Sequence, residues 1–274
     1  MIRKIWGTRV AITHARQCFA REEGMAVAEL HPTFEKMATR LERRSPLGPE
    51  DRAALLSLPH TVRRLSPAAH IIRDGDAPEY CSLLLSGYAY RYKITGEGAR
   101  QIISLHTASE FVDLQNSFLR VSDHSAQTLT EADVAFIPHA AIQDLVLARP
   151  AVARTLWIDT LIDASIFREW VVNVGRRDSR ARVAHILCEF SLRLEAAGMA
   201  QNHHYELPMT QEQLADAVGL TSVHVNRVLR QLEAEGLIDR NRRSITITQW
   251  ARLRDAGDFN ERYLHHDAKA MRGA

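Results

Sequence analysis

The chain has 274 residues, a formal net charge of +2, 46% hydrophobic residues and 25% charged residues. These values are ordinary for one or two globular domains, so they exclude global disorder and do not by themselves indicate a nucleic-acid partner. No apolar run is long enough to span a bilayer, which excludes a transmembrane helix and predicts no membrane partner. Cys18, Cys81 and Cys188 lie far apart without a disulfide or metal spacing, which favours the reducing cytoplasm.

The first 30 residues form a basic N-terminal extension without the continuous apolar stretch of a secretory signal. Two interpretations remain open: a disordered arm, or a misplaced start with Met25 as the true first residue in place of Met1. Residues 34–58 then predict short helices, because apolar residues recur at helical spacing on both sides of a break at 45–49 that contains two prolines and a glycine.

Residues 60–138 change to short apolar runs that alternate in polarity and end at turn residues. The runs cover residues 71–72, 82–85, 88–92, 101–105 and 134–137. Several short strands at this spacing predict an antiparallel β-sandwich or β-roll. With its flanking helices, we expect this domain to cover residues 31–150.

A long helix is predicted over residues 151–176, where the hydrophobic period becomes helical. Its apolar stripe is too wide for a helix that packs on a single surface. Two interpretations fit: a helix buried inside one globule, or a coiled-coil-like seam with one face on the β-roll and the other on a second copy. For the seam we assign the dimerisation residues Leu156, Leu161, Phe167, Trp170, Val171 and Val174. A second amphipathic helix over 178–197 and a loop over 198–208 follow.

Residues 210–247 carry the most informative pattern. Thr210 and Gln213 have the spacing of a capping box, which opens a first helix. Gly219 supplies a tight turn, and Thr221 can cap a second helix. The apolar positions that close the core between the two helices are Leu214, Ala215, Val218, Leu220, Val225, Val228, Leu229 and Leu232. Together with the strand pair that follows, this pattern predicts a winged helix-turn-helix.

The predicted winged helix-turn-helix domain covers residues 177–264, before a tail over 265–274. Its positive charge is local, because seven arginines between Ser222 and Arg254 outnumber three acidic residues. In this motif the first turns of the second helix enter the major groove, where arginine suits guanine and asparagine suits adenine. We therefore assign base reading to Ser222, His224, Asn226 and Arg227. Contacts to the DNA backbone are assigned to Thr210, Gln211, Thr221, Arg230, Arg240, Arg242 and Arg243.

The chain resembles the CRP/FNR superfamily of bacterial transcription regulators. The resemblance lies in residues 207–215, 218–221 and 226–229 and in Gly75, Tyr80 and Gly87. It implies an α+β fold with an N-terminal antiparallel β-roll (a double-stranded β-helix of the cyclic-nucleotide-binding type), a long dimerisation helix and a C-terminal winged helix-turn-helix. It also implies a homodimer that binds a pseudo-palindromic operator in double-stranded DNA, a signal sensed by the β-roll, and RNA polymerase as a further partner.

The same resemblance places the family's guanine-reading arginine on Arg227. The glutamate that many members use three to four residues earlier falls on Val223, which cannot accept a hydrogen bond from cytosine. We therefore expect an operator that differs from the best-known half-sites of the family.

The resemblance also locates an effector pocket at Val112, Asp113, His124 and Ser125, in place of the Gly-Glu and Arg-Ser pairs of cyclic-nucleotide-binding members. Loss of the arginine removes the charge-assisted phosphate contact, and a neutral histidine is a poor replacement, so we do not expect cyclic AMP. An iron–sulfur cluster needs several N-terminal cysteines, and Cys18 alone does not supply them. Haem is not expected either, because the histidines of the roll are isolated. We predict no cofactor, and an effector of unidentified structure.

Three alternatives to a DNA-binding regulator make different demands on the sequence. A cupin-like enzyme would need clustered histidines and a carboxylate on adjacent strands, and His106 and Asp113 do not have that spacing. A winged helix that serves only as an assembly module, or a basic face that is merely solvated, stays open as an alternative, although arginines at groove-reading positions argue against both. We therefore predict a cytoplasmic, nucleoid-associated transcription regulator that is not an enzyme.

Overall fold

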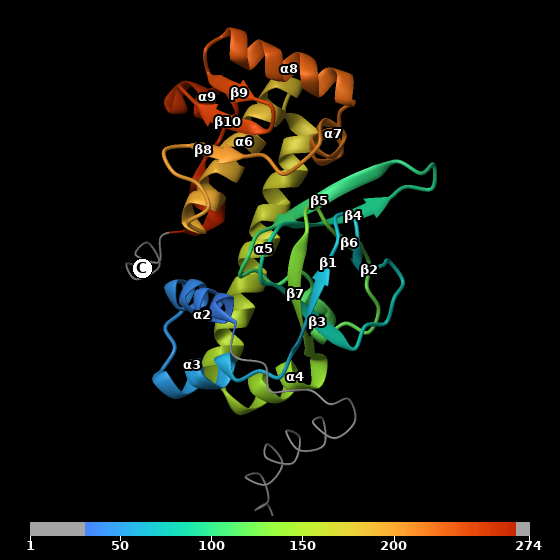
Figure 1. Cartoon of the computed structure of the whole chain (residues 1–274), viewed down its shortest axis with the longest axis vertical. Coiled ribbons are helices and arrows are strands. Elements are labelled where there is room, and N and C mark those ends of the chain that lie inside the picture. Colours follow the sequence, from blue (N-terminus) through green and yellow to red (C-terminus); the bar gives the residue numbers. More distant parts are fainter. Residues whose placement is uncertain (1–30, 267–274) are drawn as a thin grey trace, which may run out of the picture.

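The computed structural model describes residues 31–266, and a single long helix organises them. Helix α5 (Pro150–Arg176) runs through the middle of the molecule, with the β-roll beside it and the C-terminal helices and strands at its far end (Figure 1). The N-terminal extension 1–30, with Cys18 and the alternative start at Met25, lies outside the described residues, as does the tail from 267 onward.

The predicted helices before the roll are confirmed as α2 (Pro32–Arg44) and α3 (Pro49–Leu56). Each begins with a proline in its first turn, where the missing N–H has no helical partner to lose. The break between them contains Ser45, at which the chain of α2 becomes extended. The apolar face of α2, which includes Phe34 and Leu41, is fully buried. A further helix, α4 (His139–Ala148), closes the roll before α5.

The roll consists of two antiparallel sheets, as predicted. One has the strand order β1-β7-β3 and the other β2-β6-β4-β5. Their bounds are β1 (Thr61–Leu65), β2 (His70–Ile72), β3 (Tyr80–Leu84), β4 (Ala89–Ile94), β5 (Arg100–His106), β6 (Ser125–Thr128) and β7 (Ala132–Pro138), with the short 3-10 helix η1 (Leu114–Ser117) after β5. Gly87, in the β3–β4 turn, has φ +75, and a side chain there would meet the carbonyl oxygen of Glu131 at 2.3 Å. Only glycine fits at this position.

The C-terminal part contains α6 (Ser179–Ala196), α7 (Gln211–Val218), α8 (Ser222–Ala234) and α9 (Trp250–Ala256), with η2 (Glu261–Leu264) at the end. Helix α6 is capped by Asp178, whose Oδ1 accepts from the amide of Ala181 at 2.8 Å. We predicted α6 to be amphipathic, which is wrong: it is buried on almost all sides because roll, α5, α7, α8 and α9 surround it. No helix among residues 31–266 is both long and apolar enough to cross a membrane.

The wing is a three-stranded sheet of order β8-β10-β9, comprising β8 (His204–Glu206), β9 (Ile238–Asn241) and β10 (Ser244–Ile247). The prediction of a plain loop over 198–208 is therefore wrong. Tyr205 of β8 pairs with Ile245 of β10 and is buried beneath the sheet. A three-residue strand gives too short an alternation to be recognised without its partner.

The roll and the winged helix share one apolar core. Tyr90 and Leu105 of the roll belong to the same cluster of buried side chains as α6, α7 and α8. Polar contacts reinforce the junction, because the side-chain amide of Gln101 donates to the carbonyl of Asp216 at 2.7 Å. Arg100 also forms an ion pair with the Asp216 carboxylate at 2.7 Å. The roll and the winged helix therefore pack as one body in this structure.

Candidate DNA-binding surface and sensory domain

Helices α7 and α8 form the predicted helix-turn-helix. The amide of Gln213 donates to the Thr210 hydroxyl at 3.1 Å, and the amide of Thr210 donates back to the Gln213 side chain at 2.8 Å. This reciprocal pair is the capping box. Gly219 then adopts the left-handed conformation with φ 63, and the Thr221 hydroxyl accepts from the amide of His224 at the start of α8. Both threonine hydroxyls thus begin a helix, and the backbone contacts predicted for Thr210, Gln211 and Thr221 involve the exposed starts of α7 and α8.

The outward face of α8 has a basic and apolar character. Val225, Val228, Leu229 and Leu232 point into the core, as predicted. On the opposite side, Val223, Arg227 and Arg230 are exposed and follow one another at spacings of four and three residues. These spacings align their side chains on one face of the helix.

The predicted base-reading residues do not all lie in the centre of that face. Ser222 and Arg227 are exposed, whereas His224 and Asn226 are half-buried at its two edges. Val223, which we treated only as a replaced glutamate, is 69% exposed and lies in the centre. Its distance of four residues from Arg227 was the sequence signal that this position belongs to the same surface.

Two of the three predicted wing arginines project freely. Arg242, with φ 56, and Arg243 form the exposed tip between β9 and β10. Arg240 is instead half-buried, and its guanidinium binds Glu233 of α8 at 3.0 Å. The assignment of Arg240 to the DNA backbone stays a prediction, and this ion pair holds its guanidinium against Glu233 rather than leaving it free at the tip.

The residues assigned to the seam of α5 divide into two groups. Leu156 and Trp170 are 4% exposed and pack inside the protomer, so they do not line an open seam. The indole N–H of Trp170 is held by the buried carboxylate of Glu189 at 2.9 Å. Leu161, Phe167 and Val171 are about half exposed, and Val174 is half-buried.

One further exposed aromatic residue of α5 lies outside the predicted set. Trp157 is 67% exposed and lies one turn before Leu161 on the open side of the helix. The apolar stripe was therefore correctly judged too wide for one surface, but its inner and outer halves could not be separated by periodicity.

The four residues of the predicted effector pocket are buried and engaged with the protein itself. Val112 belongs to a compact cluster of the roll. Asp113 Oδ1 accepts from the amide of Ser82 at 2.6 Å, and Ser125 Oγ accepts from the amide of Asp74 at 3.0 Å. His124 contacts the carboxylate of Asp123 at 2.8 Å, and burial lowers its pKa. None of the four lines the cavity that the roll forms with α2 and α5.

Asp113 is the most strongly perturbed of these groups. Burial raises its pKa to about 6, although the hydrogen bonds from Ser82 and the charge of Arg91 oppose the effect. Its two oxygens both face Ser82, whose hydroxyl lies 3.3 Å from Oδ2. The Asp113 carboxylate therefore links β3 to the segment after β5 through hydrogen bonds.

The sequence matches two domain families. Residues 62–149 match the cyclic nucleotide-binding domain and residues 181–256 match the Crp-like helix-turn-helix domain, so the two matches together span more than half of the chain. Transcriptional activator protein FnrL of Cereibacter sphaeroides is 27% identical over 196 residues, 70% of this chain and 78% of that protein. Nitrogen fixation regulation protein FixK of Rhizobium meliloti is 27% identical over 211 residues, 76% of this chain and 90% of that protein.

The fold is also found among solved structures. FixK2 from Bradyrhizobium japonicum superposes with a TM-score of 0.68 at 24% identity, covering 73% of this chain and 98% of that chain. The overall fold of this chain is therefore similar to that of FixK2. With both domain families matched in this order, the chain belongs to the CRP/FNR superfamily of DNA-binding transcription regulators.

Proposed function

We propose that the protein binds a pseudo-palindromic operator as a homodimer and reads it with the face of α8 that carries Val223, Arg227 and Arg230. This exposed face is the observation that carries the proposal. Arg227 supplies a two-pronged donor for guanine, and Val223 supplies an apolar contact for a thymine methyl group. Arg230 and the wing tip at Arg242 and Arg243 neutralise phosphates. Ser222, His224 and Asn226 flank this face and contact neighbouring bases.

The exposed side of α5 supports the dimer. Trp157, Leu161 and Val171 share one side with the small residue Ala164, at alternating spacings of four and three residues with Arg168 between. This is the repeat by which two helices pack along a seam. A two-fold axis along α5 would place two copies of α8 about one DNA turn apart, which suits a pseudo-palindrome.

The residues present do not fit the cofactors known from the resemblance. Cys81 and Cys188 are buried in different clusters, and burial raises the pKa of both thiols, so they are unsuited to an iron–sulfur cluster. His124 replaces the arginine of a cyclic-nucleotide site, and its lowered pKa leaves it neutral. His106 is buried and enclosed between Ser104 and Glu110, which leaves its imidazole poorly placed for a haem iron. The proposal thus includes neither cyclic AMP, an iron–sulfur cluster nor haem.

The name of the relative FnrL, a transcriptional activator protein, supports a role in activation. The proposal includes RNA polymerase as the second partner. A regulator of this kind works in the cytoplasm on the nucleoid, and the proposal includes no catalytic activity. An effector of unidentified structure remains part of the proposal, but it is not assigned to Val112, Asp113, His124 and Ser125, because these residues are engaged with the protein itself.

The experiment that tests base reading is selection of operators from a random DNA pool, followed by gel-shift titration. Arg227→Ala should lose about 5- to 150-fold in affinity for the selected operator, the equivalent of about 1–3 kcal/mol for one bidentate contact. Its binding to random DNA should change little. Arg120→Ala, which removes an exposed arginine of the roll, is the matched control. Operator selectivity that survives Arg227→Ala would refute the assignment.

A further inference from the structure

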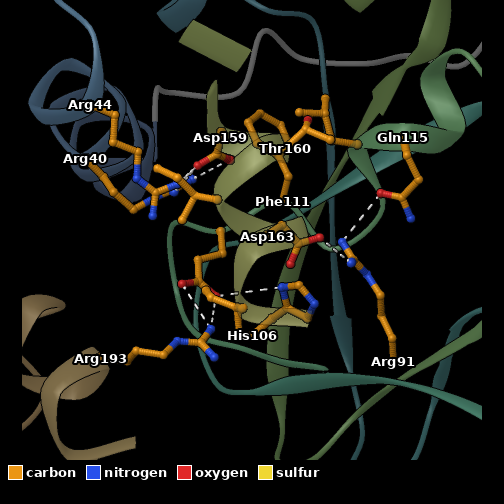
Figure 2. A pocket seen from close by; sticks show the side chains of 14 residues that line it. Arg40, Arg44, Arg91, His106, Phe111, Gln115, Asp159, Thr160, Asp163 and Arg193 are labelled. Atoms are coloured by element: carbon orange, nitrogen blue, oxygen red, sulfur yellow. Dashed lines mark hydrogen bonds and ion pairs between the residues drawn. The ribbon is translucent and has the colours of Figure 1, made fainter. Parts of the chain in front are cut away.

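A small cavity lies where α2, the end of β5 and α5 meet. Its volume is about 40 Å³, room for about three water molecules. Arg40 and Arg44 reach into it from α2, Asp159 and Asp163 from α5, and Arg91 from β4 (Figure 2).

The charged groups of this cavity are unevenly paired. Arg91 pairs with Asp163 at 2.6 Å, and Arg193 pairs with Glu110 at 3.0 Å. The remaining carboxylate, Asp159, is shared by two guanidinium groups, those of Arg40 and Arg44. Figure 2 shows both arginines converging on it from the same helix.

His106 also lines the cavity, but it adds no charge. Burial lowers the pKa of His106 to about 3, so the imidazole is neutral. Burial alone would raise the pKa values of Glu110 and Asp163, but Arg193 and Arg91 respectively outweigh it and lower each to about 2. The lining therefore carries four positive and three negative charges.

Arg44 is the group with unused hydrogen-bonding capacity. Among residues 31–266, its guanidinium binds only Asp159, whereas Arg40 also donates to the carbonyl of Ser109 at 3.1 Å. Burial, and next the charge of Arg40, lower the pKa of Arg44 to about 9. A guanidinium has five N–H donors in a planar fork, so most of those of Arg44 have no acceptor in the protein. The side chain of Arg44 is 15% exposed, so its free N–H groups remain accessible to a bound anion.

We propose that this cavity binds a compact oxyanion, with a planar or tetrahedral group such as nitrate, acetate or phosphate held between Arg44 and Arg40. Guanidinium forks match paired oxygen acceptors better than a spherical ion, which selects an oxyanion over chloride. The bound anion balances the extra positive charge. The site is distinct from Val112, Asp113, His124 and Ser125, which do not line the cavity, and α2 supplies its principal ligands.

The position on α5 gives the site access to the outer face of that helix. Asp159 and Asp163 point inward, while Trp157 and Leu161 on the same turns are exposed. An anion that binds Arg44 beside Asp159 therefore contacts an ion pair of the helix that carries the proposed dimer seam. Oxyanion binding itself goes beyond the proposed DNA-binding function and does not depend on it.

The test is isothermal titration calorimetry on the full chain with sodium phosphate, nitrate and acetate, each at constant ionic strength balanced by chloride. At least one oxyanion should bind saturably to the wild-type protein with one site per protomer. Arg44→Gln should weaken this binding at least about tenfold, the loss expected for one charge-assisted contact. Arg43→Gln is the matched control, because Arg43 is the exposed neighbour on α2 and its replacement removes the same charge.

Three results would overturn the proposal: no saturable binding of any of the three anions, equal binding by Arg44→Gln, or an equal loss in Arg43→Gln. If Arg44→Gln does not fold, Arg44→Lys replaces it as the test, because lysine keeps the charge and loses the planar fork. Binding by Arg44→Lys that equals wild type would likewise overturn it. Gel shifts on the same proteins separate the two proposals: intact operator binding without oxyanion binding refutes only the cavity.

Discussion

The buried carboxyl group of Asp113 makes the stability of the roll depend on pH in a way that one substitution removes. Its pKa is about 6 in the folded protein against an ordinary value of 3.8. That difference of about two pH units corresponds to about 3 kcal/mol, at about 1.36 kcal/mol per unit. Asp113→Asn keeps an oxygen for the amide of Ser82, and its NH₂ group can donate to the Ser82 hydroxyl. The substitution therefore removes the ionisation and retains most of the hydrogen bonding.

The sign follows from the direction of the change. At low pH the carboxyl group is protonated in both folded and unfolded chains and has no electrostatic cost. As the pH rises from about 4 to about 6, the unfolded chain releases its proton first, so the wild-type protein loses stability through this range. Above about 6 the loss is complete. Relative to wild type, Asp113→Asn should therefore gain about 3 kcal/mol in unfolding free energy between about pH 4 and pH 7.

The assay is urea unfolding, followed by circular dichroism, at a series of pH values between about 4 and about 7 for both proteins. Taking the difference between the two proteins cancels the pH dependence of other groups, such as His106. Asp133→Asn is the control, because Asp133 also accepts from a serine hydroxyl, that of Ser86, at the edge of the roll. A difference between wild type and Asp113→Asn that stays constant across the pH range would show that Asp113 is not held at a raised pKa.

Three further outcomes follow from the packing. Tyr263→Phe should lower the unfolding free energy by about 1.5–3 kcal/mol, because the hydroxyl donates to the buried Glu189 at 2.8 Å. Tyr80→Phe, at an exposed site, should change the unfolding free energy little. Equal effects of the two substitutions in urea unfolding would contradict this prediction. Gly87→Ala should lower the melting temperature strongly, because the added methyl group clashes with Glu131. Gly96→Ala, whose methyl group meets nothing within 4 Å, should not. Similar melting curves for the two variants would contradict the requirement for glycine in the β3–β4 turn. Leu161→Glu should convert the proposed dimer to a monomer, as measured by light scattering. Leu147→Glu, at an 82% exposed site on α4, should not. A wild-type protein that is monomeric at micromolar concentration would refute the proposed dimer.

Local sequence signals predicted the parts of the fold that depend on near neighbours. The capping box of Thr210 and Gln213, the left-handed Gly219 and the buried positions of α8 all involve residues within one or two helical turns. Such features require no knowledge of the rest of the chain. They were sufficient to place the outward face of α8, and so most of the candidate DNA surface.

The features that were missed depend on residues far apart in the chain. Strand β8 forms because its Tyr205 meets Ile245, forty residues later. The indole N–H of Trp170 donates to the buried carboxylate of Glu189, which also accepts from the Tyr263 hydroxyl, and a hydrophobic period cannot show such a partner. The pairing of Arg40 with Asp159 joins residues 119 positions apart. Hydrophobic periodicity indicates how much of a helix is covered, but the covering partner comes from the tertiary fold.

The contacts between the roll and the winged helix limit how a signal can reach α8. The winged helix is joined to the roll by Gln101 and Arg100, which contact Asp216 of α7. Arg193 of α6 also binds the carbonyl of Leu105 at 2.6 Å and pairs with Glu110. Rotation of the winged helix relative to the roll would have to break all of these contacts and disrupt the shared apolar core. In the proposed dimer, the spacing of the two α8 helices is therefore set mainly by how the two α5 helices cross. A signal that changes this spacing must either act on the inner face of α5, where Asp159 and Asp163 lie, or first release Asp216.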